Sequence, residues 1–429
     1  MDGSTDGTWA ARIKRAFVWA VTATVIGLVA GFGTVMLAYA LVLAAKVMEQ
    51  GPVFGWLLPL GGLLTIGVYR VLKVPWTVTT NTVVAAARTD AAVAPVVAPA
   101  IVFGTTMTNM FGGSAGQEAA VLELGGALGS GIGRWTRTQK GVADVFKEGS
   151  SDGTFILCGM AGAFSALLFA PLCSTLFVIE LARTHADLRR GLAVLVSALT
   201  GYLVADRFMP ADSWLDLTPL ADVGVMWEAC LAVVAVATVA GVLYCLAIRA
   251  VRKAAGTLFK DAVSRLVVLG AAIALLVNLG GLLPYAGPGD ALMRTALHGE
   301  AATWDFVGKL VVTALVIGVG FKGGELTPSM TIGACAGCTV GHLMGVEPGV
   351  CAAIGLVAIF SATTNTPVGS FLLGVEAFGL PLAPYFAVAA VLAFLPTIKL
   401  SLYECNQIPS YGQLLDAVRQ TFGGLPRWQ

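Results

Sequence analysis

Length, composition and charge exclude several classes of protein. Of 429 residues, 57% are hydrophobic and only 12% are charged, which is too few to cover a soluble globule, where about 25% is usual. The net charge of +1 disfavours a nucleic-acid partner. The 52 glycines are spread through apolar segments, where they favour close helix contacts and interrupted helices. The sequence therefore predicts an all-α polytopic membrane protein with the composition of a transporter.

The first predicted element is a long, tilted membrane helix over residues 16–45. Its apolar run is too long for a cleavable signal peptide. Arg12, Lys14 and Arg15 precede it, which predicts a cytoplasmic N-terminus. Apolar segments then recur to about residue 402 without a long polar linker. We therefore expect a single integral domain in the cell membrane, without a cytoplasmic regulatory domain, a cofactor or a metal site.

The next segment with unusual chemistry is FGGSAGQEA, which contains Glu118. It also satisfies the hydrolase pattern G-x-S-x-G around Ser114, which raises the alternative of an intramembrane serine hydrolase. No strand-like segment precedes Ser114, and only His185, His298 and His342 could serve as its base. The hydrolase is therefore a remote alternative.

The chain contains two internal matches. A shift of 208 residues (324 minus 116) aligns GQEAAVLELGGALGSGIG, from Gly116, with GELTPSMTIGACAGCTVG, from Gly324. A shift of 196 residues (360 minus 164) aligns FSALLFAPLCSTLFVIE, from Phe164, with FSATTNTPVGSFLLGVE, from Phe360. The smaller second shift predicts a shorter loop in the second half.

Both matched regions place glycines or a proline just before a helix. Helix N-termini inside a membrane favour an anion, because their first backbone N–H groups are unpaired. Backbone at that depth has to be covered by protein or line a watery cavity. We therefore predict two homologous transmembrane repeats, residues 1–215 and 216–429, that meet at an anion site.

Acidic residues at these breaks are candidates for the transport chemistry, because a carboxylate there is costly unless it is protonated, paired or functional. Ionised Glu118 would occupy the place of the anion and protonated Glu118 would leave it. The alternatives are that Glu118 only caps a helix, and that Glu325, in GFKGGELTP, only pairs with Lys322. Glu123 and Glu180 are interpreted as structural.

Three motifs, in this order, resemble those of the CLC chloride channel and transporter family: GGSAGQEAAVLELGGALG, CGMAGAFSALLFAPLCSTLFVIE and GGELTPSMTIGACAG. The resemblance covers nearly the whole chain. It implies the CLC fold, in which two helical repeats of inverted topology, with broken helices, meet at a central anion site. It also implies a homodimer with one anion pathway per subunit, and transport in place of catalysis.

Within that family, GFKGGELTP and TNTPVGSFLLGVE are most similar to the fluoride/proton antiporter branch. The similarity implies that Glu118 is the gating and proton-coupling glutamate and that Glu325 is a second coupling glutamate. The segment WTVTTNTV stands where the family has its first anion motif, G-S-G-I-P, and KLSLYECNQI contains the family's central tyrosine. The residues that the resemblance assigns to the anion path each carry a side-chain donor: Thr79, Asn81, Thr327 and Tyr403.

The resemblance therefore implies an antiporter that exports fluoride in exchange for protons, with fluoride or chloride, protons and membrane lipid as partners. A chloride/proton exchanger and a passive anion channel are alternatives on the same fold. The chloride exchangers carry an internal proton-carrying glutamate where this chain has Leu181, which favours the fluoride branch. Thr79 leaves the selected halide open, because a threonine hydroxyl could coordinate either ion.

Overall fold

The computed structural model of the chain describes residues 5–139, 145–146, 152–184, 187–210 and 226–403. Within these ranges the regular secondary structure is helical, and extended backbone pairs only at one isolated bridge. The helices of the first half are α1 (Thr5–Glu49), η1 (Pro52–Leu57), α2 (Leu58–Val71), α3 (Thr80–Thr89), α4 (Val97–Met110), α5 (Glu118–Thr138), α7 (Asp152–Leu168), α8 (Pro171–Ala182) and α9 (Leu188–Phe208). Those of the second half are α10 (Trp227–Leu258), α11 (Ala262–Leu279), η3 (Leu283–Tyr285), α12 (Asp290–Leu297), α13 (Asp305–Val319), α14 (Leu326–Met344), α15 (Pro348–Thr364), α16 (Pro367–Phe378), η4 (Leu380–Leu382), α17 (Ala383–Phe394) and η5 (Leu395–Thr397).

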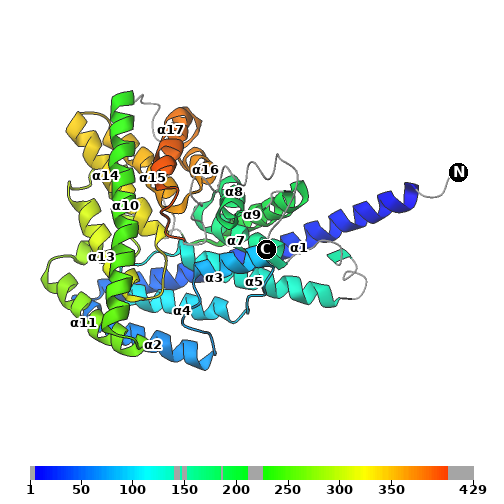
Figure 1. Cartoon of the computed structure of the whole chain (residues 1–429), viewed down its shortest axis with the longest axis horizontal. Coiled ribbons are helices and arrows are strands. Elements are labelled where there is room, and N and C mark those ends of the chain that lie inside the picture. Colours follow the sequence, from blue (N-terminus) through cyan, green and yellow to red (C-terminus); the bar gives the residue numbers. More distant parts are fainter. Residues whose placement is uncertain (1–4, 140–144, 147–151, 185–186, 211–225, 404–429) are drawn as a thin grey trace.

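Six helices in the described ranges are long and apolar enough to cross a membrane, as expected of a polytopic membrane protein. The first of them, α1, begins earlier and ends later than the predicted helix over residues 16–45, because helix-forming alanine and lysine flank the apolar run and no proline interrupts it. Its 45 residues span about 68 Å, against a hydrocarbon thickness of about 30 Å. Helix α1 therefore extends beyond the bilayer core, and its N-terminal part projects from the other helices (Figure 1).

The short helices α8 and α16 lie side by side (Figure 1) and stabilise each other's first turn. They begin at Pro171 and Pro367, which the shift of 196 residues (367 minus 171) aligned. Glu180 of α8 accepts hydrogen bonds of 3.2 and 2.7 Å from two backbone N–H groups in the first turn of α16. Glu376 of α16 accepts bonds of 3.0 and 2.6 Å from the first turn of α8. The structural role predicted for Glu180 agrees with this reciprocal capping.

Glycines of both repeats allow the closest helix contacts. Gly125 of α5 faces Gly159 of α7, and Gly333 of α14 faces Gly355 of α15, so that a Cβ added at any of them would collide with the backbone of the partner helix. Such small residues let helices approach closely in lipid, where packing replaces the hydrophobic effect between helices. The same device therefore joins the same pair of helices in each half.

The connection between the two helices that the glycines join differs in length between the halves. Residues 345–347 join α14 to α15, whereas residues 139–151 join α5 to α7, which confirms the shorter loop predicted in the second half. The predicted boundary between the repeats, at 215/216, lies outside the described residues. The reciprocal contacts between the halves are those expected of two repeats with inverted topology.

Candidate functional site

The two glycine-rich breaks meet each other. The backbone N–H of Gly116 donates to the carbonyl of Gly324, and the N–H of Gly324 donates to the carbonyl of Gly116, each at 2.7 Å. These are the residues that the first sequence shift aligned, so the pairing relates equivalent positions of the two repeats. Helix α5 begins with Glu118 and α14 begins with Leu326, two residues after the respective glycines. The bridge therefore holds two helix N-termini close together.

Glu118 binds the N-terminus of α14, and we call this contact the gate. Its Oε2 accepts hydrogen bonds from the backbone N–H of Thr327, at 2.9 Å, and from the Thr327 hydroxyl. That hydroxyl in turn accepts a bond of 3.4 Å from the backbone N–H of Gln117. Glu118 and Thr327 are fully buried, and Oε1 of Glu118 makes no hydrogen bond among the described residues. The carboxylate therefore fills the place in which the N-terminus of α14 could bind a free anion.

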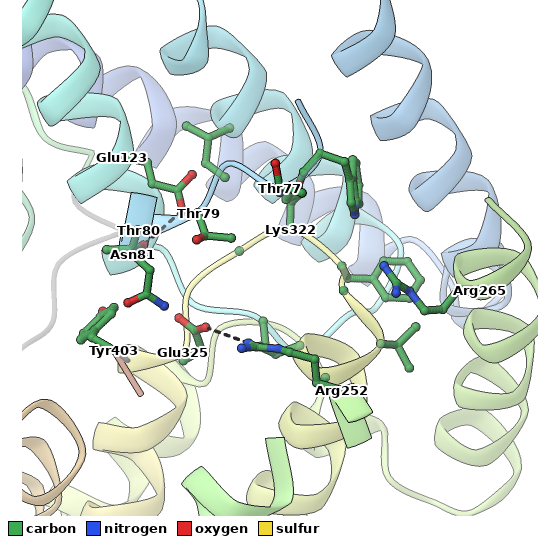
Figure 2. A pocket seen from close by; sticks show the side chains of 18 residues that line it. Thr77, Thr79, Thr80, Asn81, Glu123, Arg252, Arg265, Lys322, Glu325 and Tyr403 are labelled. Atoms are coloured by element: carbon green, nitrogen blue, oxygen red, sulfur yellow. Dashed lines mark hydrogen bonds and ion pairs between the residues drawn. The ribbon is translucent and has the colours of Figure 1, made fainter. Parts of the chain in front are cut away.

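A cavity of about 310 Å³ opens next to the same helix N-terminus. Four of the predicted site residues line it, and Figure 2 shows their side chains around one space: Thr79, Asn81, Glu325 and Tyr403. Glu118 and Thr327 are not among the lining residues. The structure thus divides the six predicted site residues between the buried Glu118–Thr327 contact and an adjoining cavity.

The segment with Thr79 is held in place by a lysine from the other half. Nζ of Lys322 donates hydrogen bonds to the carbonyls of Trp76, at 2.8 Å, and Val78, at 2.9 Å. The ammonium also lies over the rings of Tyr69 and Trp76, 5.0 and 4.6 Å from their centroids. Thr79 then starts α3 as its N-cap residue. Lys322 of GFKGGELTP therefore positions the counterpart of the first anion motif at the cavity.

Tyr403 reaches the cavity from the far end of the described chain. The backbone N–H of the preceding residue, Leu402, donates to the carbonyl of Thr363 in α15 at 2.8 Å, and Ser401 Oγ donates to the same carbonyl at 3.0 Å. Tyr403 is 1% exposed although it lines the cavity. Its ring is therefore enclosed by protein, and its position is fixed through α15.

Glu325 has a different partner from the one considered on sequence grounds. Its Oε1 lies 3.9 Å from Nη2 of Arg252 in α10, drawn as a dashed line in Figure 2. The alternative of a pair with Lys322 is not observed, because Lys322 donates to backbone carbonyls. Helical spacing could not reveal Arg252 as a partner, since the two residues belong to different elements. Its sequence signal is the group of basic residues near the end of α10, Arg249, Arg252 and Lys253.

Sequence reasoning also missed the position of Glu123. It was interpreted as structural, but its side chain lines the same cavity as Glu325. Thr80 donates a hydrogen bond of 3.1 Å to its Oε1. Arg265 lines the cavity as well, from the first turn of α11. The cavity therefore contains two carboxylates and three basic side chains, those of Lys322, Arg252 and Arg265 (Figure 2).

The arrangement around Ser114 does not support a hydrolase. The Ser114 hydroxyl lies 2.7 Å from the hydroxyl of Thr313 and accepts a bond of 2.9 Å from Nζ of Lys309. Lys309 also donates to two backbone carbonyls, at 3.1 and 2.7 Å, so its three protons are engaged and it cannot serve as a base. Two of the candidate bases contact backbone carbonyls, and the third lies outside the described residues: His298, His342 and His185.

Comparisons with known proteins agree on one family. The profile of the voltage gated chloride channel family matches residues 61–397. A chloride/fluoride channel protein of Pseudomonas syringae pv. tomato is 26% identical over 419 residues, which cover 91% of this chain and 86% of that protein. The H(+)/Cl(-) exchange transporter ClcA of Vibrio parahaemolyticus is 26% identical over 284 residues, which cover 61% of this chain and 58% of that protein.

Solved structures confirm the predicted fold. A crystal structure of a CLC-type fluoride/proton antiporter is similar with a TM-score of 0.81 and 24% identity, over 91% of this chain and 98% of that one. A slow cyanobacterial Cl-/H+ antiporter is similar with a TM-score of 0.75 and 17% identity, over 94% of this chain and 99% of that one. Because the family profile matches most of the sequence and the fold agrees, this chain belongs to the voltage gated chloride channel (CLC) family.

Proposed function

We propose that this protein is an antiporter that exports fluoride in exchange for protons. The observation that supports this most is the gate, in which the carboxylate of Glu118 is bound by the N–H and hydroxyl of Thr327. These donors are the groups that a free anion needs, so the anion and the ionised carboxylate exclude each other. A proton on Glu118 removes the charge that the donors hold, and the side chain then leaves the position. Anion movement is thereby coupled to a proton.

Glu325 is proposed as the second coupling group. It lines the cavity beside the gate and faces Arg252 across 3.9 Å. At this separation the two groups do not form a hydrogen bond. Glu325 can therefore exchange a proton with the cavity without breaking a strong contact.

The cavity supplies hydrogen-bond donors for a small anion. Thr79, Asn81 and Tyr403 line it, and their side chains are labelled in Figure 2. Charge-assisted hydrogen bonds are shorter and stronger than neutral ones, and fluoride, the smaller halide with the more concentrated charge, gains more from them than chloride does. The motif GFKGGELTP and the relative named a chloride/fluoride channel protein support fluoride as the substrate.

Chloride/proton exchange is the second candidate, because the ClcA relatives are named for that activity. It would use the same gate. A passive anion channel, the remaining alternative, would let the anion pass without a fixed number of protons. The first two candidates differ in which halide moves faster, and the channel differs from both in proton movement.

We also propose a homodimer in the cell membrane with a cytoplasmic N-terminus. Arg12, Lys14 and Arg15 lie on α1 before its apolar part, which supports this orientation. The repeats are proposed to span residues 1–215 and 216–429. Cross-linking in native membranes tests the dimer. Labelling of a cysteine introduced near the N-terminus from either side of sealed vesicles tests the orientation.

The deciding experiment measures fluoride or chloride release from proteoliposomes together with proton movement in the opposite direction. We expect fluoride efflux to exceed chloride efflux and to be accompanied by proton uptake. Equal or faster chloride release with proton uptake would reject the fluoride assignment and favour the chloride exchanger. Anion release without proton uptake would favour the channel.

A further inference from the structure

Glu123 is a buried carboxylate to which the gate mechanism assigns no task. It is 5% exposed, and its Oε1 accepts a hydrogen bond of 3.1 Å from the Thr80 hydroxyl. Its Oε2 is buried and makes no hydrogen bond among the described residues. An ionised carboxylate at membrane depth is costly unless it is compensated or functional. A second acceptor oxygen without a donor is not what a purely structural cap requires, as the fully bonded pairs of Glu180 and Glu376 illustrate.

The charged and titratable groups that face Glu123 come from other elements. Glu123 interacts through its charge with Lys322 and Glu325, and also with Tyr69 in α2. Lys322 approaches without a hydrogen bond to Glu123 in the structure, because its Nζ donates to two backbone carbonyls of the segment before α3. The positive charge therefore compensates an ionised Glu123 through space and leaves Oε2 available to take up a proton.

Glu123 and Glu325 share one cavity. Both side chains line it, and Figure 2 shows Glu123 on one side and Glu325 on the other, with Thr79 and Asn81 between them in this view. The cavity holds about 310 Å³, which is room for several waters at roughly 30 Å³ each. A proton can thus pass between the two carboxyl groups through water.

We propose that Glu123 is a third proton-binding residue of the exchange cycle, which relays the transported proton to and from Glu325 across the shared cavity. In this step the O–H bond at Glu325 breaks and one forms at Oε2 of Glu123, so the total charge in the cavity is unchanged and no further reactant is needed. The inference rests on the proposed antiport. It gives the chain a proton site on α5, the helix that also begins with the gating Glu118.

The test is Glu123→Gln in the full-length protein, in proteoliposomes in which fluoride release and proton uptake are recorded together. Glutamine keeps the volume and an oxygen that can accept from Thr80, but it does not take up a proton at neutral pH. We expect fluoride release to continue while proton uptake per fluoride falls at least about tenfold, as when a general acid or base is removed. Glu123→Asp, which retains a carboxylate, should restore most of the proton uptake.

The matched control is Thr80→Val, which removes the hydrogen bond to Glu123 and leaves the carboxylate. If Glu123 acts by taking up a proton, this variant keeps the proton-to-fluoride ratio of the wild type. An unchanged ratio in Glu123→Gln, or an equal loss in Thr80→Val, would show that Glu123 only joins α3 to α5.

Two further outcomes are also decisive. If Glu123→Gln does not give a folded protein by size exclusion, the pH profile of Glu123→Asp decides: a shifted profile of proton uptake supports the proposal, and an unchanged profile overturns it. If the wild type itself releases fluoride without taking up protons, the proposed antiport fails first, and this inference fails with it. If the wild type couples fluoride to protons and Glu123→Gln does so equally well, the antiport stands and only the role proposed for Glu123 is rejected.

Discussion

Replacing Glu118 by glutamine removes the charge that keeps the gate closed, but it keeps the shape and one acceptor oxygen. In the wild type two hydrogen bonds from Thr327 reach Oε2. A hydrogen bond to a charged group contributes about 1.5–3 kcal/mol and a neutral one about 0.5–1.5 kcal/mol. For the two bonds the substitution therefore weakens closure by about 2–3 kcal/mol, which favours the anion over the side chain by roughly 30- to 150-fold.

The assay is fluoride efflux with simultaneous proton uptake, measured in proteoliposomes as a function of pH. The wild type should slow as the pH rises, because fewer Glu118 carboxyl groups carry a proton. Glu118→Gln should release fluoride at a rate that no longer depends on pH and without proton uptake. Glu300→Gln, the same change at an exposed site, serves as the control. Proton uptake in proportion to fluoride in Glu118→Gln would show that Glu118 only caps α14, and competition at the gate would be refuted.

Two further substitutions test the cavity and the hydrogen bonds of the buried Lys309. Tyr403→Phe removes one hydroxyl, and we expect fluoride affinity to fall by about 1–2 kcal/mol, or roughly 5- to 30-fold, in titration calorimetry; unchanged affinity and flux would place Tyr403 outside the anion path. Lys309→Met leaves the Ser114 hydroxyl and two part-buried carbonyls without their charged donor, and it should destabilise the protein by about 1–3 kcal/mol. Thermal unfolding in detergent measures this against Lys260→Met at an exposed position, and equal melting of the two variants would contradict the structural role of Lys309.

The membrane class and the repeats could be predicted because they depend on composition and on spacing along the chain. Glycines recurring at the same intervals in both halves, such as Gly125 and Gly333, require the same close helix contact in each half. The prolines before α8 and α16 likewise mark helix starts directly, because proline suits the first turn of a helix. The predicted start of α1 is too late, because the helix begins before its hydrophobic pattern does.

The partners within the site could not be predicted, because they join elements that are distant in sequence. A pair of Glu325 with Lys322, three residues before it, was one alternative on sequence grounds, whereas the observed partner Arg252 belongs to α10. Glu123 follows Glu118 on the same helix but faces the cavity, because α3 brings Thr80 to it. Only the family resemblance, and no spacing rule, brought Tyr403 together with Thr79. Tertiary packing decides such contacts, and the periodicity of residues along a single sequence does not reveal which distant elements pack together.

The reciprocal capping by Glu180 and Glu376 has a consequence for biogenesis and ancestry. When the ribosome has completed α8 at Ala182, the glutamate that will satisfy its first turn is still 194 residues (376 minus 182) from being synthesised. The first turn of α8 is therefore made before its capping glutamate exists, and α16 can dock on α8 only after most of the second half has been synthesised. An unduplicated ancestor would have met the same need with a second copy of itself, each glutamate capping the other chain. Gene fusion would then have made a contact between two subunits permanent within one polypeptide.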